Sequence, residues 1–156
     1  MFETKVSDLG DHLGYWLRCL SNFVSHSFAE RLAKENVSVP QWVLLRTLYS
    51  HDKVTLNQLA QMVGLDKSSV SRMVERLVQR KLVNRDEGND RRSLGLGLTP
   101  AAKKLVPRLA RHADLNDETF FKSLSQKQHG EFLRVIKQLL HANGWNQSER
   151  GRYGIE

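Results

Sequence analysis

The chain has 156 residues, and 24 Lys plus Arg against 17 Asp plus Glu give a formal net charge of +7. Its length suits one domain with a sizeable core, and the basic balance favours a polyanionic partner. No apolar run approaches the roughly 18 to 20 residues of a membrane-spanning helix, and the start MFETKVSDLG does not resemble a signal peptide, so we expect a cytoplasmic protein. Cys19 is the only cysteine, which excludes an internal disulfide and a multi-cysteine zinc site.

The first part of the chain is predicted to be a series of helices. Residues 7–34 repeat apolar side chains at three- to four-residue steps, which predicts one long helix. A second helix should begin after Ser38, which opens a Ser-x-x-Gln capping box, and run to about Ser50. The next helix should begin with a second capping box at Thr55, and Gly64 supplies the left-handed residue that ends this helix.

A helix-turn-helix is predicted from the residues that follow Thr55. A small Ala60, a glycine four residues later and Val70 six residues beyond have the spacing with which two short helices pack across a tight turn. An ordinary helical hairpin would show the same spacing. The composition of the second helix favours the DNA-binding motif, because its apolar residues leave hydroxyl groups and cations on the outer face.

That outer face carries hydroxyl groups near the start of the helix and arginines after them. Hydroxyl groups and a helix N-terminus suit phosphate oxygens, and an arginine one turn further along can bind a guanine edge through two hydrogen bonds. We therefore predict a DNA-binding surface here. Its members are Thr55, Lys67, Ser68, Ser69, Ser71, Arg72 and Arg76.

Two short strands and two further helices are predicted next. LVNRD and SLGLGL read as strands around the polar loop DEGNDRR, with Leu94, Leu96 and Leu98 facing the core. The alternating glycines would let the second strand lie close to a neighbouring segment or to the DNA backbone. Thr99 begins the next helix, and Ser125 opens the last with another Ser-x-x-Gln box.

This order of elements resembles the MarR family of winged-helix transcriptional regulators. The resemblance rests on PQWVLL, on LAQMVGLDKSSVSRMVERLVQRKLVNR and on NDRRSLGLGLTPA, which fits the family's Asp-x-Arg wing motif. It implies a mainly α fold with a small β-hairpin in one domain, residues 1–142. A winged helix-turn-helix lobe would span about 40–99, dimerisation helices about 7–34 and 100–141, and residues 143–156 would form a mobile tail.

The wing motif adds three residues to the predicted DNA-binding surface. In such proteins the wing arginine, here Arg92, enters the minor groove, and the aspartate, here Asp90, supports the loop. The physical reason is that a narrow minor groove concentrates negative potential and attracts guanidinium groups. Arg91 is expected at a phosphate. The alternative for Asp90 and Arg92 is a surface ion pair of little energetic value.

Apolar residues in the terminal helices exceed what a small core needs, so we expect a homodimer that reads a palindrome. The resemblance also implies a small-molecule effector. Trp42 and Arg46 combine an aromatic wall with a cation suited to an aromatic carboxylate, and Cys19 and Asn22 would face them. In the alternative interpretation Trp42 is a core residue, Arg46 is a surface charge and Cys19 is an inert buried thiol.

Together these features predict a sequence-specific regulator that binds double-stranded DNA, a repressor released by a small aromatic or anionic effector. The alternative is a nonspecific architectural or RNA-binding winged-helix module without effector control. The sequence has no HExxH, no phosphate-binding glycine loop and no nucleophile motif. We therefore expect neither enzymatic activity nor a cofactor or metal.

Overall fold

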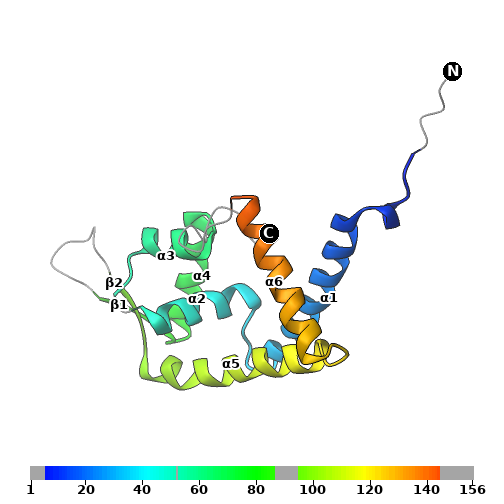
Figure 1. Ribbon diagram of the computed structural model, residues 1–156. Helices are drawn as coiled ribbons and strands as arrows, with labels where there is room; N and C mark the ends of the chain where they lie inside the picture. The colour runs from blue at the N-terminus through cyan, green and yellow to red at the C-terminus, as the bar shows by residue number, and fades with distance from the viewer. Residues whose placement is uncertain (1–5, 52, 87–94, 145–156) are drawn as a thin grey trace.

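The computed structural model describes residues 6–51, 53–86 and 95–144. The elements in chain order are a short 3-10 turn η1 (Leu9–Asp11), α1 (Leu13–Ala33), α2 (Val39–Ser50), α3 (Leu56–Val63), α4 (Lys67–Gln79), β1 (Val83–Asp86), β2 (Gly95–Leu98), α5 (Pro100–Phe120) and α6 (Gln126–Ala142). Figure 1 shows α2, α3, α4 and the hairpin gathered as a lobe at one end of α5, with α1 and α6 at its other end. The predicted mainly α fold with a small β-hairpin is confirmed.

The predicted helix starts are confirmed at four hydroxyl side chains. Ser38, Thr55 and Ser125 each accept a hydrogen bond from the backbone N–H of a glutamine three residues later, and the glutamine side chain returns the contact. The Thr99 hydroxyl accepts a hydrogen bond from the N–H of Ala102 at 3.2 Å. Pro100 follows at the first helical position, where its lack of a backbone N–H leaves no donor unpaired. Each cap satisfies backbone donors that the helix itself leaves unpaired.

The first helix begins at Leu13, so the prediction of one helix from residue 7 was wrong. A separate 3-10 turn precedes it, in which the backbone N–H of Asp8 donates to the Asp11 carboxylate at 3.1 Å. The indole Nε1 of Trp16 donates to the carbonyl oxygen of Gly10 at 2.9 Å. These local hydrogen bonds stabilise the turn instead of a continued helix, and apolar periodicity alone does not reveal them.

The hydrophobic core lies between the lobe and the first half of α5. Its fully buried members come from every helix of the lobe, from the end of α1 and from α5, and include Leu32, Leu44, Leu45, Leu59, Val70, Leu77, Val83 and Leu109. α5 is also held on α1, because Ser27 donates to the buried side chain of Asn116 at 2.7 Å. α5 therefore belongs both to the lobe and to the terminal helices.

The hairpin is antiparallel, with Val83 opposite Leu98 and Asp86 opposite Gly95. Leu96 also exchanges two backbone hydrogen bonds with Val54, at 2.7 and 3.1 Å, which adds a one-residue third strand. A Cβ atom at Gly95 would lie 3.3 Å from the Cα of Lys53, so the predicted close approach to a neighbouring segment is confirmed there. Leu96 and Leu98 are buried as predicted, and Leu94 lies outside the described residues.

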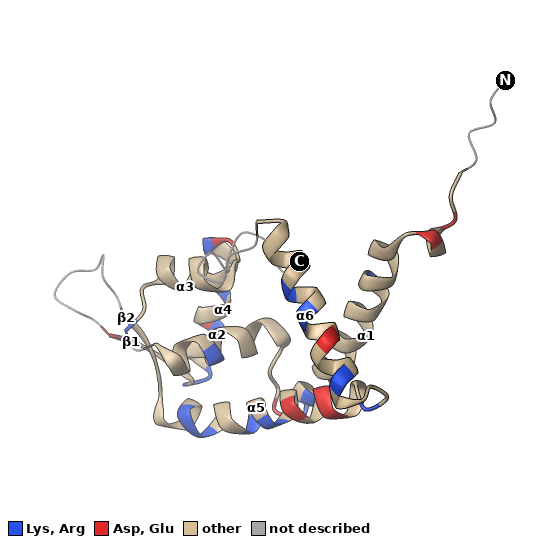
Figure 2. Ribbon diagram, in the orientation of Figure 1, with Lys and Arg blue, Asp and Glu red and all other residues tan. Residues whose placement is uncertain are grey.

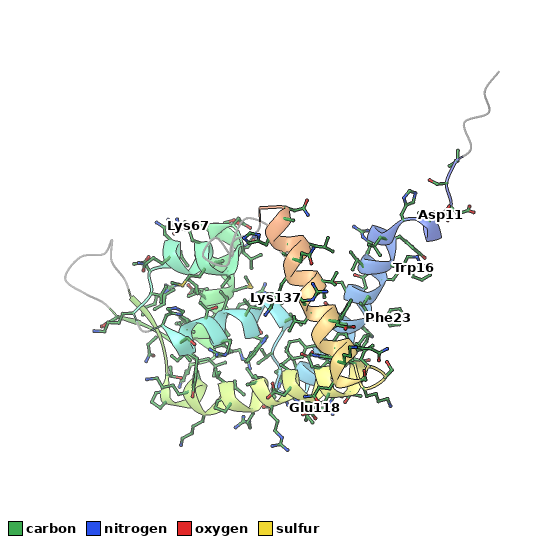
Figure 3. All side chains as sticks on the ribbon, in the orientation of Figure 1. Asp11, Trp16, Phe23, Lys67, Glu118 and Lys137 are labelled. Carbon is green, nitrogen blue, oxygen red and sulfur yellow. The ribbon has the colours of Figure 1, made fainter. Side chains whose placement is uncertain are left out.

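The terminal helices leave many apolar side chains in solvent. No residue of α6 is buried, and in α1 only Leu32 is. Exposed large apolar residues in this region are Leu9, Leu13, Tyr15, Trp16, Leu17, Phe23, Leu133, Val135, Leu139 and Leu140. Trp16 and Phe23 lie on α1, far from the lobe (Figure 3). In the part of the chain that the structure describes, no helix combines the length and apolar character needed to cross a membrane.

Candidate DNA-binding surface

α3 and α4 form the predicted helix-turn-helix. Gly64 ends α3 in the left-handed conformation, with φ of 78°, and its N–H donates to the carbonyl oxygen of Ala60 at 2.9 Å. Ala60 and Val70 are both buried, with exposed fractions of 7% and 0%. The small residue, the glycine turn and the branched residue therefore take the places that their spacing predicted.

α4 turns its apolar face into the core and its polar face outward. Val70, Val74 and Leu77 are buried on the inner face. Of the predicted DNA-binding residues in this motif, Lys67, Ser68, Arg72 and Arg76 are exposed, whereas Thr55, Ser69 and Ser71 are half-buried. Lys67 stands at the first turn of α4, at the outer edge of the lobe (Figure 3).

The first turn of α4 already holds a negative charge. The Asp66 carboxylate accepts hydrogen bonds from the hydroxyl of Ser68 at 2.6 Å and from the backbone N–H of Ser69 at 2.9 Å. These bonds, the one from Ser68 foremost, hold the pKa of Asp66 far below its ordinary range. A phosphate at this helix end would meet a carboxylate beside the exposed cation Lys67, so further electrostatic attraction would come from the cations along α4.

Arg72 and Arg76 are those cations. Within residues 6–51, 53–86 and 95–144, neither guanidinium has a hydrogen-bonding or ion-pairing partner. Glu75, which lies between them in the sequence, pairs instead with Arg85 of β1 at 2.6 Å. The Glu75 carboxylate is thereby paired with β1, and the pair links α4 to the hairpin.

Sequence reasoning missed Arg85 as a member of this surface. The pair it forms joins residues ten positions apart on different elements, so no helical spacing indicates it. Lys53 and Asp86 form a second pair at the base of the hairpin, at 3.5 Å. The predicted wing residues Asp90, Arg91 and Arg92 lie outside the described residues, so their DNA contacts stay a prediction.

Within the described residues, no hydrogen bond, ion pair or ring contact joins the four predicted effector-binding residues to one another. Trp42 meets Phe28 edge to face, with ring centroids 6.3 Å apart, and packs against the core. Arg46 donates to Ser50 and lies over the Tyr49 ring. Cys19 is half-buried, and its hydrogen bond with Tyr15 raises the pKa of that phenol, while Asn22 is exposed. A binding site built from these four residues stays a prediction.

A hollow of about 530 Å³ lies elsewhere, between α5 and α6. It is lined by Asp114, Asp117, Glu118, Phe121, Leu124, Gln126 and His129. Figure 2 shows acidic residues, in red, at this end of α5, with basic residues, in blue, nearer the lobe. Three carboxylates repel an anion, so the hollow does not suit the predicted aromatic acid.

Comparison with known proteins agrees with this geometry. A family model described as MarR family matches residues 37–94. The chain is 25% identical over 137 residues to the HTH-type transcriptional regulator MgrA of Staphylococcus aureus, covering 86% of this chain and 92% of MgrA. Residues 37–94 are therefore a MarR-family segment. The chain is related to DNA-binding transcriptional regulators rather than to enzymes.

Solved structures of MarR-family proteins share the fold. BpsR of Bordetella bronchiseptica, whose DNA binding is regulated by 6-hydroxynicotinic acid, aligns with a TM-score of 0.77 at 21% identity, over 86% of this chain and 98% of BpsR. A MarR-family protein of Mycobacterium tuberculosis, solved in complex with DNA, aligns with a TM-score of 0.70 at 20% identity, over 82% of this chain and 97% of that one. The winged helix-turn-helix fold predicted from the sequence is confirmed.

Proposed function

We propose that this chain is a MarR-family repressor that binds a palindromic DNA operator as a homodimer. The observation that carries the proposal is the outer face of α4, where Arg72 and Arg76 are exposed and have no partner among the described residues. An arginine at that place on a recognition helix can form two hydrogen bonds to a guanine edge. The wing residues Asp90 to Arg92 would add a minor-groove contact.

The terminal helices support the homodimer. Leu13 and Trp16 on α1 and Leu139 on α6 are 67%, 55% and 45% exposed. Large exposed apolar patches mark interaction sites, and a second copy offers the same surface across a two-fold axis. In this proposal residues 7–34 and 100–141 form the dimerisation unit, and 40–99 form the DNA-binding lobe.

A small aromatic or anionic effector would release the operator. BpsR, which shares the fold, is regulated by 6-hydroxynicotinic acid, an aromatic acid. Trp42 and Arg46 lie one turn apart on α2 and offer an aromatic ring and a cation. A calorimetric titration of the protein with a series of aromatic carboxylates would test this part. If none of them gave a heat of binding, the result would count against an effector of this class.

The DNA-binding proposal is tested with duplexes selected by the protein from a random library. Arg72→Ala should reduce the affinity ratio between the selected and a random duplex about 5- to 150-fold, the equivalent of about 1 to 3 kcal/mol. Arg111→Ala is the matched control, because Arg111 is exposed on α5 and has no partner among the described residues. Equal wild-type affinity for both duplexes, with the same salt dependence, would instead indicate a nonspecific module.

A further inference from the structure

The end of the recognition helix α4 is attached to two other parts of the chain. Arg80, the residue that caps α4, donates from Nη1 to the carbonyl oxygen of Asn36 at 2.6 Å and from Nη2 to that of Glu35 at 3.5 Å. The following residue, Lys81, accepts a hydrogen bond from the hydroxyl of Thr99 at 2.8 Å. The first attachment joins α4 to the turn after α1, and the second joins it to the start of α5.

Glu35 carries the first attachment onward to the middle of α5. Its carboxylate accepts from Nη2 and Nε of Arg108 at 3.2 and 3.4 Å, and Nε2 of His112 lies 3.6 Å from the same group. The Glu35 and His112 side chains are 23% and 22% exposed, whereas Arg108 is 60% exposed, so water screens the pair with Arg108 more than the contact with His112. Glu35 thus holds the end of α4 through its backbone and α5 through its side chain.

Together these two attachments fix the angle between α5 and the winged-helix lobe. Thr99 and Arg108 lie roughly 14 Å apart along α5, at the 1.5 Å rise of an α-helix. One attachment alone, at Thr99, would act as a hinge about which α5 could tilt against the lobe. The apolar contacts of Leu105 and Leu109 hold α5 on the lobe, but apolar contact has little directional preference. The ion-paired contact of Glu35 supplies the direction.

We propose that Glu35 is a positioning residue that sets the distance between DNA half-sites read by the dimer. This inference rests on the proposed function. Because α5 runs from the lobe to the dimerisation helices, a tilt of α5 moves the two recognition helices relative to each other across the two-fold axis. Half-sites lie at a defined spacing on the duplex, so this angle determines which spacing fits.

The test is a series of operators that keep both half-sites and change their separation by one or two base pairs. Each added base pair rotates one half-site by about 34°, so wild-type affinity should fall at least about tenfold for each step. Glu35→Ala should reduce this penalty to about threefold or less. Its affinity for a duplex with a single half-site should stay within about twofold of wild type, because the DNA-binding surface itself is unchanged.

Controls separate positioning from a general loss of folded protein. Glu30→Ala removes a carboxylate from α1 whose ion pair, among the described residues, is with His26 at 3.5 Å, and it should leave the spacing preference intact. Arg108→Ala should broaden the preference as Glu35→Ala does, and the double variant should go no further. Arg108→Ala also serves as the test variant if Glu35→Ala does not fold.

Two results would overturn the inference. One is a wild-type spacing preference in both Glu35→Ala and Arg108→Ala, and the other is an equal loss of affinity at every spacing, which is the signature of a merely structural role. Wild-type protein that binds all the operators and random DNA alike would contradict the proposed function instead. The two failures are therefore distinguishable in one data set.

Discussion

The winged-helix lobe and the terminal helices differ in where their apolar side chains go. In the lobe, Leu44, Leu59 and Leu77 are completely buried by contacts within one chain. In the terminal region, Leu13 is 67% exposed, and α6 has no buried residue. Each buried leucine contributes about 1.5 to 3 kcal/mol. One chain therefore closes the core of its lobe, whereas in the proposed homodimer the terminal helices would bury their apolar side chains against a second copy.

The largest effect on assembly is expected from a charge placed on the exposed apolar surface of the terminal helices, because it should prevent the two copies from associating. Leu139→Glu should remove about 1.5 to 3 kcal/mol of association free energy, because a symmetric interface loses two copies of a residue that is 45% exposed in one chain. Sedimentation equilibrium at micromolar concentration should then change from a dimeric to a monomeric mass. Gln138→Glu adds the same charge to the neighbouring position of α6 and should leave the mass dimeric. A dimeric mass for Leu139→Glu would contradict the assignment of this surface.

A substitution in the core of the lobe should lower the free energy of unfolding by the same amount whether or not the chain is dimeric. Leu59→Ala should lower the free energy of unfolding by about 2 to 5 kcal/mol, since it leaves a cavity in a fully buried site. Urea unfolding at two protein concentrations should give the same loss, whereas the apparent loss in Leu139→Glu should change with concentration. Gln61→Ala, on the exposed side of α3, is the control. A loss below 1 kcal/mol would mean that the lobe core is not closed within one chain.

The smallest effect concerns the junction between the two regions. Arg108 foremost, and His112 after it, hold the pKa of Glu35 below its ordinary value of 4.5. The unfolded chain therefore binds more protons in acid, so this contribution to stability is complete above pH 4.5 and is lost as the pH falls through the lowered pKa.

Chemical unfolding across this pH range can isolate that contribution. The free energy of unfolding of wild type should fall more steeply with decreasing pH than that of Glu35→Gln. Glu30→Gln should keep the wild-type slope. Parallel curves for wild type and Glu35→Gln would show that the carboxylate adds nothing to the stability of the junction.

Sequence signals that span only a few residues predicted the fold well. The helix ends depend on contacts within one turn of backbone, so the spacing of residues in the sequence is enough to predict them. Examples are the capping boxes at Ser38, Thr55 and Ser125 and the left-handed Gly64. The start of α1 was the exception. There the Asp8 turn competes with the helix through equally local hydrogen bonds, and the apolar pattern of residues 7–34 does not distinguish the two.

Contacts that join distant segments could not be predicted in this way. The pair between Glu35 and Arg108 spans 73 positions, and the bridge between Val54 and Leu96 is a single residue with no strand pattern. The candidate DNA-binding surface likewise has a part that local sequence pattern predicts and a part that depends on contacts between distant segments. The outward position of Arg72 and Arg76 follows from helical periodicity, whereas the pairing of Glu75 with Arg85 depends on how the hairpin packs against α4.

The chemistry of the helix caps has a practical consequence for studies of DNA release. α2, α3, α5 and α6 begin on the neutral hydroxyls of Ser38, Thr55, Thr99 and Ser125, and the three capping boxes are completed by glutamine rather than glutamate. Hydrogen bonds between neutral groups are little affected by ionic strength, unlike contacts between protein cations and phosphates. Added salt should therefore detach the protein from DNA long before it loosens these helix ends, so that a salt titration of binding measures phosphate contacts rather than unfolding.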